Sequence, residues 1–233
     1  MPSAPYRRPV PTGSLPATRP AAIIFDLDGT LVDTVATRIA AWQAAFAERG
    51  IPAQPAHVAE LIGSDGRRLA REVAAAAGVT LATDDDEEID ARSGAIFTDL
   101  NREPRPLAGA RDLLSGLDAA GLRWAIATSS RRDQVAASVG ALALARPPLV
   151  VDGTHVEHAK PAPDLLLLAA RTLDVAPITC WYVGDATWDM RAAVAAGMTP
   201  IGVTSGAVDA AALIASGARV VVSSLADLGA ALD

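Results

Sequence analysis

Short, continuous hydrophobic runs alternate along the chain with longer amphipathic stretches. The runs are typical of strands buried on both faces of a parallel sheet, because apolar residues do not alternate there with polar ones. They cover Ala22–Phe25, Trp124–Thr128, Leu149–Asp152, Trp181–Asp185, Pro200–Val203 and Arg219–Val222. Stretches with helical periodicity cover Ala108–Ala120, Arg132–Val139, Asp164–Leu173, Thr187–Ala196 and Asp209–Ala215. This alternation predicts an α/β fold with a doubly wound parallel sheet.

The interval from Thr34 to Pro106 breaks the pattern, because it contains helical periodicity and no convincing strand. Its apolar positions fall on two helical faces, one with Ile39, Trp42 and Phe46 and the other with Ile89, Ile96, Phe97 and Leu100. Asp84 followed by Glu87 predicts a capping box at the start of the second face. We therefore expect an α-helical cap domain at residues 34–106, inserted into a core formed by residues 21–33 and 107–233. Residues 1–20, rich in Pro, predict a disordered tail.

Composition narrows the possible partners. The 233 residues carry a net charge of −7, which argues against a nucleic-acid partner. No apolar run approaches the roughly 20 residues that span a bilayer, and the amino terminus lacks the apolar centre of a signal peptide, so we expect a cytoplasmic protein without a membrane partner. Cys180 is the single cysteine, which excludes a disulfide framework within the chain and favours a core residue. Composition does not indicate an oligomeric state.

Asp26 and Asp28 are the most informative residues of the chain. They follow the first hydrophobic run at positions i and i+2, and a Gly-Thr breaker comes directly after them. Residues at i and i+2 of a strand share one face, so both carboxylates are expected at the carboxyl end of a buried strand, where open α/β sheets bind ligands. Two carboxylates held this close repel each other, which favours a chemical role over a structural one. An Asx-turn pair that merely ends the strand is the alternative.

Four motifs in this order resemble the signatures of the haloacid dehalogenase (HAD) superfamily. Asp26-x-Asp28-Gly29-Thr30 resembles the nucleophile motif, Thr128 the second, Lys160-Pro161 the third and Gly184-Asp185 with Asp189 the fourth. The resemblance extends from about Ala21 to the end of the chain. The inserted cap is similar to that of the phosphoglycolate phosphatase-like group, which implies a Rossmann-like core with a helical cap.

The resemblance implies a phosphatase mechanism. Asp26 would attack phosphorus to form an aspartyl phosphate, and Asp28 would act first as general acid and then as base. We expect neighbouring carboxylates to raise the pKa of Asp28, as the first step requires. Thr128 would donate its hydroxyl to the transferring phosphoryl group, and Lys160 would offset the acidic charge.

The same resemblance implies Mg²⁺ as cofactor, since several carboxylates would otherwise repel a phosphate dianion. The side chains of Asp26 and Asp185 and the backbone carbonyl of Asp28 would bind the ion. Asp189 would ligate it directly or through water, or would simply be a first-turn acid of the following helix.

Three further residues are candidates for binding a small phosphorylated metabolite. Ser129 and Ser130 would provide donors near a helix start, although they are equally consistent with plain helix caps. Arg67, in the cap segment 62–68, would bind the far end of the substrate, with an exposed helix start as the alternative. We expect His57, His155 and His158 to be surface or loop residues.

Two other functions stay open beside a phosphomonoester hydrolase. A sugar-phosphate mutase shares the cap class and the four motifs, but such mutases usually carry a histidine near Arg38 and an acidic residue at the position of Gly184. A non-catalytic binding protein of the same family would be expected to lose Asp26, Asp28 or Lys160, and all three are present. Dehalogenase activity is disfavoured because Asp28 is present.

Overall fold

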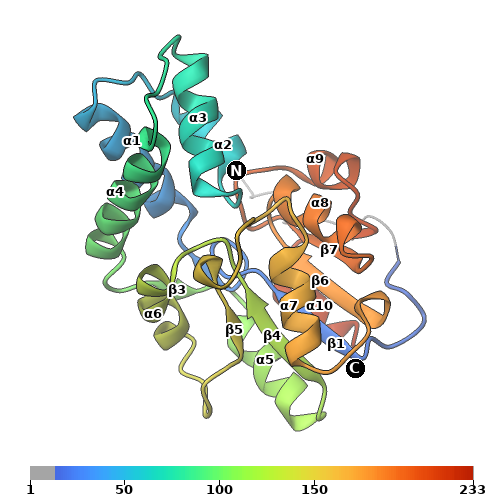
Figure 1. Cartoon of the computed structure of the whole chain (residues 1–233). Helices are drawn as coiled ribbons and strands as arrows, with labels where there is room; N and C mark the ends of the chain where they lie inside the picture. Colours follow the sequence, from blue (N-terminus) through green and yellow to red (C-terminus); the bar gives the residue numbers. More distant parts are fainter. Residues whose placement is uncertain (1–13, 233) are drawn as a thin grey trace, which may run out of the picture.

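The computed structural model describes residues 14–232, and the fold is an α/β core with a helical cap inserted near its amino terminus (Figure 1). The core sheet contains six parallel strands in the order β5-β4-β1-β6-β7-β8. These strands are β1 (Ala22–Phe25), β4 (Arg123–Ala127), β5 (Val150–Val151), β6 (Cys180–Gly184), β7 (Thr199–Val203) and β8 (Val220–Val222). The predicted fold class is confirmed, and each predicted strand lies within two residues of its observed bounds.

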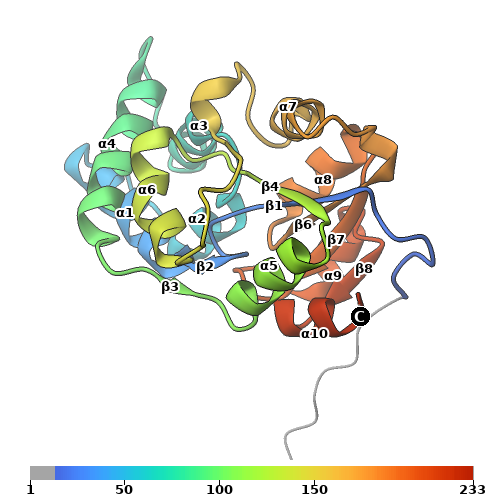
Figure 2. The same cartoon turned by 90° about the horizontal axis from the view of Figure 1, so that it is seen from below.

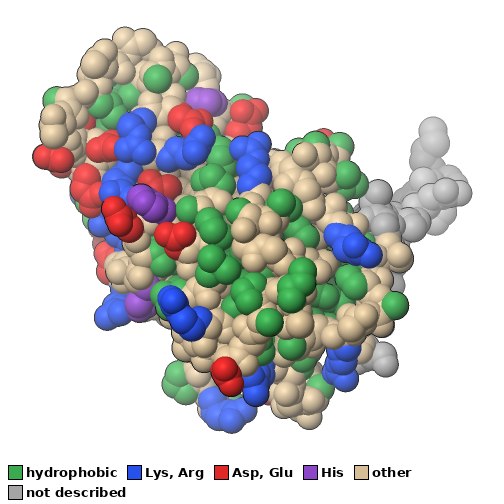
Figure 3. All heavy atoms as spheres, turned by 45° about the vertical axis from the view of Figure 1, so that its right-hand side comes forward, with side chains coloured by type: hydrophobic (Ala, Val, Ile, Leu, Met, Phe, Trp, Pro, Cys, Tyr) green, Lys and Arg blue, Asp and Glu red, His purple; other side chains and the backbone are tan. Residues whose placement is uncertain are grey.

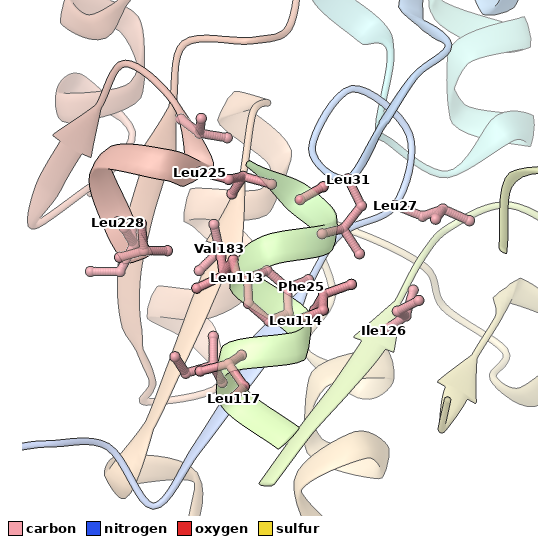
Figure 4. Packing of buried hydrophobic residues seen from close by; sticks show 14 of the residues in the cluster. Phe25, Leu27, Leu31, Leu113, Leu114, Leu117, Ile126, Val183, Leu225 and Leu228 are labelled. Atoms are coloured by element: carbon pink, nitrogen blue, oxygen red, sulfur yellow. The ribbon is translucent and has the colours of Figure 1, made fainter. Parts of the chain in front are cut away.

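Helices cover both faces of this sheet, as its fully buried strands require (Figure 2). One face packs against α5 (Ala110–Ala119), α6 (Arg132–Ala141) and α10 (Leu225–Ala230), and the other against α7 (Asp164–Thr172), α8 (Thr187–Ala195) and α9 (Ala210–Ala215). Figure 4 shows the leucines of α5 directed toward Phe25, Ile126 and Val183 of the central strands. Helix α10 has no counterpart among the sequence predictions.

The segment between β2 (Val32–Asp33) and β3 (Arg105–Pro106) contains α1 (Val35–Glu48), α2 (Pro55–Leu61), α3 (Gly66–Ala76) and α4 (Asp85–Leu100), and these four helices are called the cap below. The short strands β2 and β3 pair antiparallel where the chain leaves and re-enters the core. This two-stranded ribbon was not predicted, since two-residue strands carry no detectable periodicity. It joins the two connections between cap and core at one place.

The apolar interior of the cap extends into the core domain. Trp42, Phe46 and Ile89 form its centre, and Ala186 and Trp188 of the core belong to the same cluster. The indole nitrogen of Trp188 donates a hydrogen bond to the carbonyl oxygen of Glu60 at 2.9 Å. The cap is thus packed directly onto the start of α8.

Two sequence predictions for the cap are wrong in detail. Asp84 adopts a left-handed conformation and makes no side-chain capping hydrogen bond to α4, so the expected capping box does not form. Instead, Asp85 accepts a hydrogen bond from the backbone of Ala82. Leu100 is 54% exposed although Phe97 on the same helix is fully buried, because the end of α4 turns Asn101 rather than Leu100 inward, where its amide donates a hydrogen bond to Ser138.

The predicted tail at residues 1–20 lies largely outside the described residues. Residues 14–20 contain no helix or strand, and Leu15 packs against the core cluster that contains Phe25. Cys180 is a buried free cysteine on β6, which agrees with a core residue. Within residues 14–232, no helix combines the length and apolar character needed to cross a bilayer.

The contrast between Phe97 and Leu100 provides a stability test. Phe97→Ala should lower the free energy of unfolding by about 3–5 kcal/mol, because it leaves a cavity beneath α1 and removes the ring that lies 3.4 Å from the Arg38 guanidinium carbon. Leu100→Ala, three residues away on the same helix, should change it by less than about 0.5 kcal/mol. Denaturant unfolding measures both, and similar losses would contradict the packing described for α4.

Candidate active site

Three neighbouring strands of the sheet end in polar residues that were predicted to act together. Asp26 follows β1, Thr128 follows β4 and Asp185 follows β6. Because β1 lies between β4 and β6, these three side chains lie next to one another at the carboxyl ends of the central strands. All three are at most 3% exposed.

A buried group of carboxylates surrounds one ammonium. Asp26, Asp185 and Asp189 each place one carboxylate oxygen within 4.8 Å of the others. The Nζ of Lys160, which is fully buried, donates hydrogen bonds to Asp26 Oδ1 at 2.5 Å and to Asp189 Oδ1 at 2.7 Å. Burial of Lys160 opposes its charge, but the two carboxylates outweigh that penalty and raise its pKa well above the ordinary value. Lys160 is therefore a permanent cation in this site.

Burial and mutual repulsion disfavour the charged forms of Asp26 and Asp185. Burial raises the pKa of Asp26 to about 7, with Lys160 opposing the shift and Asp189 adding to it. Burial, together with the charges of Asp189 and Asp26, also raises the pKa of Asp185 well above its ordinary value. One ammonium does not offset this much buried negative charge, so the cluster is suited to binding an additional cation.

Small residues let Asp185 occupy this position. Its Oδ1 accepts a hydrogen bond from the Thr30 hydroxyl at 2.7 Å. A Cβ placed on Gly29 would lie 2.4 Å from Asp185 Oδ2, and a Cβ on Gly206 would lie 1.8 Å from the same atom. Gly29 also has a φ of +84°, so the Gly-Thr breaker after Asp28 provides both the turn and the space for this carboxylate.

Asp28 belongs to a different network from the acidic cluster. Its carboxylate accepts hydrogen bonds from the Arg38 guanidinium at 2.8 Å, from Ser130 Oγ at 2.6 Å and from Thr34 Oγ1 at 2.7 Å. Burial raises the pKa of Asp28, but the charge of Arg38 and these hydrogen bonds outweigh it and lower the pKa overall. The expected upward shift is wrong, because the nearest charge is a guanidinium rather than a second carboxylate. The Asp28 side chain does not join the group of Asp26, Asp185 and Asp189.

Asp189 makes contacts that favour a positioning role. Its Oδ1 accepts from Lys160 and from the Tyr182 hydroxyl, and its Oδ2 accepts from the backbone nitrogen of Ala186 at 2.9 Å. Both oxygens are thus occupied by protein donors. Asp189 lies close enough to share a cation with Asp26 and Asp185, and it also orients Lys160.

The residues that follow β4 contact both the cap and Asp28. Thr128 lines the same cavity as Asp26 and accepts a hydrogen bond from the backbone nitrogen of Ser130. Ser129 Oγ donates to the carbonyl of Gly63 in the cap at 3.1 Å, whereas Ser130 donates to Asp28. Neither serine caps α6, whose N-cap is Arg131.

The cap covers this edge of the sheet, and a cavity of about 50 Å³ lies between cap and core. Trp42, Ile62, Leu69 and Asp90 contribute its cap side, and Asp26, Thr128 and Lys160 lie on its core side. Arg67 does not line this cavity. It donates a hydrogen bond to the Glu157 carbonyl at 3.0 Å and lines an adjoining crevice.

The histidines take no part in the acidic cluster. In the part of the chain that the structure describes, the group with metal-ligand spacing contains only aspartates. His155 accepts a hydrogen bond from the backbone nitrogen of Asp152, and His57 lies on α2 of the cap. His158 lines a surface hollow beside Pro161.

Sequence reasoning missed two residues of the site. Arg38 is buried on α1, lies over the Phe97 ring and donates to Gln134 and Ser130 as well as Asp28. Its position four residues before Trp42, on the apolar side of the predicted helix, was an available signal because a buried arginine requires partners. The phenol of Tyr182, in the buried strand before Gly184, required a partner for the same reason.

Comparisons with known proteins agree with the motif pattern. A family model for haloacid dehalogenase-like hydrolases matches residues 23–203. The chain is 33% identical over 184 residues to N-acetylmuramic acid 6-phosphate phosphatase of Pseudomonas putida, covering 76% of this chain and 79% of that protein. It is 33% identical over 219 residues to phosphoglycolate phosphatase of Rhodospirillum rubrum, covering 90% of each. A crystal structure of a hydrolase from Pseudomonas syringae superposes with a TM-score of 0.85 at 33% identity, over 89% of this chain and 95% of that one.

The Arg38 network leads to a measurable expectation. Arg38→Met should lower the free energy of unfolding by about 3 kcal/mol, because it leaves the buried Asp28 carboxylate without its cation. Arg92→Met removes an exposed cap arginine that pairs with Glu48, and it should leave the melting temperature nearly unchanged. Thermal unfolding compares the two. Equal shifts would show that the Arg38–Asp28 pair contributes no more than a surface pair.

Proposed function

The chain belongs to the haloacid dehalogenase-like hydrolase family, and we propose from that membership that it is a Mg²⁺-dependent phosphomonoester hydrolase acting on a small phosphorylated metabolite. The proposal rests on the surroundings of the Asp26 carboxylate. This carboxylate lines a cavity of about 50 Å³ beside a buried ammonium and a second acid, Asp185. This combination suits a nucleophile that attacks an anionic phosphoryl group.

Asp26 would attack phosphorus as a carboxylate. The new bond joins an Asp26 oxygen to phosphorus, the bond between phosphorus and the ester oxygen breaks, and the alcohol leaves. Water then cleaves the aspartyl phosphate and regenerates Asp26 with release of phosphate. Lys160 supports both steps because its charge lies 2.5 Å from Asp26 Oδ1 and offsets negative charge as the phosphoryl group arrives. The Thr128 hydroxyl would donate to that group.

Asp28 would move the proton in both steps. As a carboxylate held by Arg38 and Ser130, it is in the form required of the base that accepts a proton from the attacking water. Acting as the acid toward the leaving oxygen requires a proton on Asp28, and therefore release of the Arg38 and Ser130 hydrogen bonds. Arg38 lies on the cap, so this release is linked to how the cap sits over the core.

The side chains present fit a hard divalent cation. Asp26 and Asp185 supply carboxylate oxygens, and the glycines at 29 and 206 leave space for Asp185 to face Asp26. These two side chains and the Asp28 carbonyl would hold the ion, with Asp189 at the edge of the set. When bound, Mg²⁺ neutralises charge on the phosphoryl group and the acids. A small phosphorylated metabolite is the partner that a cavity of this size suits.

Two positions favour hydrolysis over the mutase alternative. Arg38 occupies the place at which such mutases usually carry a histidine, and its contacts here go to Asp28 and Gln134. Any side chain at Gly184 would meet Asp189, since a Cβ there would lie 2.4 Å from the Asp189 carboxyl carbon. The acidic residue common at this point in the mutases is therefore incompatible with the packing of Asp189.

Replacing the proposed nucleophile tests the mechanism. Asp26→Asn should reduce phosphate release from p-nitrophenyl phosphate by at least about 10³-fold, because an amide does not attack phosphorus. The control Asp33→Asn changes an exposed acid in β2 and should keep normal turnover. The wild-type protein should release phosphate from members of a panel of phosphomonoesters. Substantial activity in Asp26→Asn would refute the mechanism, and isomerised sugar phosphate without phosphate release would favour a mutase.

Metal binding has a readout that does not depend on turnover. Mg²⁺ at about 100 times its Kd should raise the melting temperature by about 5 °C. Because the pKa of Asp26 is raised to about 7, protons compete with the metal at lower pH, so the shift should be smaller at pH 6 than at pH 8. Asp185→Asn should remove most of the shift. An equal Mg²⁺ effect in that variant would place metal binding elsewhere.

A further inference from the structure

The cavity above Asp26 is too small for a whole sugar phosphate. Its volume is about 50 Å³, and one water molecule requires about 10–15 Å³ of such space. The cavity therefore has room for a phosphoryl group and only a few more atoms. The organic part of a larger substrate needs a second space that opens from the first.

A larger crevice lies between cap and core and adjoins the catalytic cavity. Its volume is about 350 Å³, and it shares Gly66, Asp90 and Ser129 with the catalytic cavity. Arg67 and Glu87 line its cap side, and the core side includes Arg131 and the segment around Glu157. Figure 3 shows basic and acidic side chains intermingled where the cap meets the core.

Asp90 stands at the boundary between the two spaces. A Cβ on Gly66 would lie 1.9 Å from Asp90 Oδ1, so the absence of a side chain at 66 allows this carboxylate to reach the boundary. Asp90 Oδ2 is held by Arg131 at 2.8 Å. Any substrate that extends from the phosphoryl position into the crevice would pass this carboxylate.

The charges of the crevice are unbalanced toward the negative. Its lining includes four acids, Asp65, Glu87, Asp90 and Glu157, and two arginines, Arg67 and Arg131. The excess remains negative with Asp90 protonated, because three carboxylates still outnumber two guanidiniums.

Both arginines are also engaged already. Arg131 pairs with Glu87 at 2.6 Å and with Asp90 at 2.8 Å. Arg67 donates to the Glu157 carbonyl and lies 3.6 Å from Asp65 and 3.9 Å from Glu87. A carboxylate on the substrate would have to compete with these acids for the same guanidiniums.

Hydroxyl groups meet no such competition. A hydroxyl donates to a carboxylate and accepts from a guanidinium, so it can be satisfied without displacing an ion pair. Placing another anion among these acids costs electrostatic free energy.

We propose that this crevice binds the uncharged, hydroxyl-bearing body of a phosphorylated sugar or polyol, and that Glu87 and Asp90 select against substrates whose body carries a carboxylate. This selectivity rests on the proposed phosphatase activity. It also assigns Arg67 to the crevice, where it positions acids and hydroxyl groups instead of pairing with a distal anion.

Two matched substrate pairs test the proposal. N-acetylglucosamine 6-phosphate and N-acetylmuramic acid 6-phosphate differ by a lactyl ether that carries a carboxylate, and 2-hydroxyethyl phosphate and phosphoglycolate differ by a hydroxymethyl group against a carboxylate. We expect kcat/KM to favour the uncharged member of each pair by about tenfold. A preference of that size for the carboxylated members would overturn the proposal.

A charge variant tests whether the crevice is responsible. Glu87→Gln should reduce the preference for uncharged substrates by about threefold, since it removes one acid from the crevice. The matched control is Glu88→Gln on the same turn of α4, where Glu88 pairs with Arg49 within the cap. The preference should be unchanged in the control, and equal changes in both variants would overturn the assignment to the crevice.

The outcome also separates this inference from the phosphatase proposal. Phosphate release with reversed preference would overturn the selectivity alone. Absence of release from every ester, p-nitrophenyl phosphate included, would overturn the phosphatase proposal and the selectivity with it.

Discussion

The ammonium of Lys160 is the interaction on which the arrangement of the site depends. Asp26 and Asp185 are buried at the ends of neighbouring strands and Asp189 is buried in the first turn of α8, and each carboxylate alone would be costly to remove from water. Lys160 contacts two of them and is itself fully buried, so the acids and the base require one another. Removing one partner of a buried ion pair destabilises a protein strongly, whereas replacing both partners with apolar residues often does not. The site is thus a single electrostatic unit, although its members come from three separate segments of the chain.

Much of the core was predictable because its signals are local. The continuous apolar runs at Ala22–Phe25 and Trp181–Asp185 favour buried strands, and the acids at their carboxyl ends mark one edge of the sheet. The order of the motifs then indicated which strand ends meet. Short elements were predicted unevenly: α9 and β5 were identified, whereas the equally short α10 and β2 were not.

The contacts of Asp28 and Arg67 could not be predicted because they depend on how the cap docks. The motif identified Asp28, but its pairing with Arg38 arises from a helix ten residues further on, after the cap has folded back onto the core. Arg67 was assigned to the substrate's far end from a run of glycines and arginines. Its actual surroundings, Glu157 on the core and Glu87 on α4, lie 90 and 20 residues away in sequence. Such contacts join segments that are distant in sequence, so no single stretch of the sequence predicts them.

Trp188 links the cap to the acidic cluster. Its indole completes the apolar interior of the cap and binds Glu60, yet it lies between Asp185 and Asp189 on the first turn of α8. Five consecutive residues therefore hold the candidate metal ligand, the cap's anchor and the partner of Lys160. Substitutions at Trp188 that suit a different cap would also disturb the neighbouring Asp185 and Asp189. Divergence of substrate range in such a protein would be expected to proceed through positions remote from this turn, such as those of α4, and to leave residues 185–189 under joint constraint.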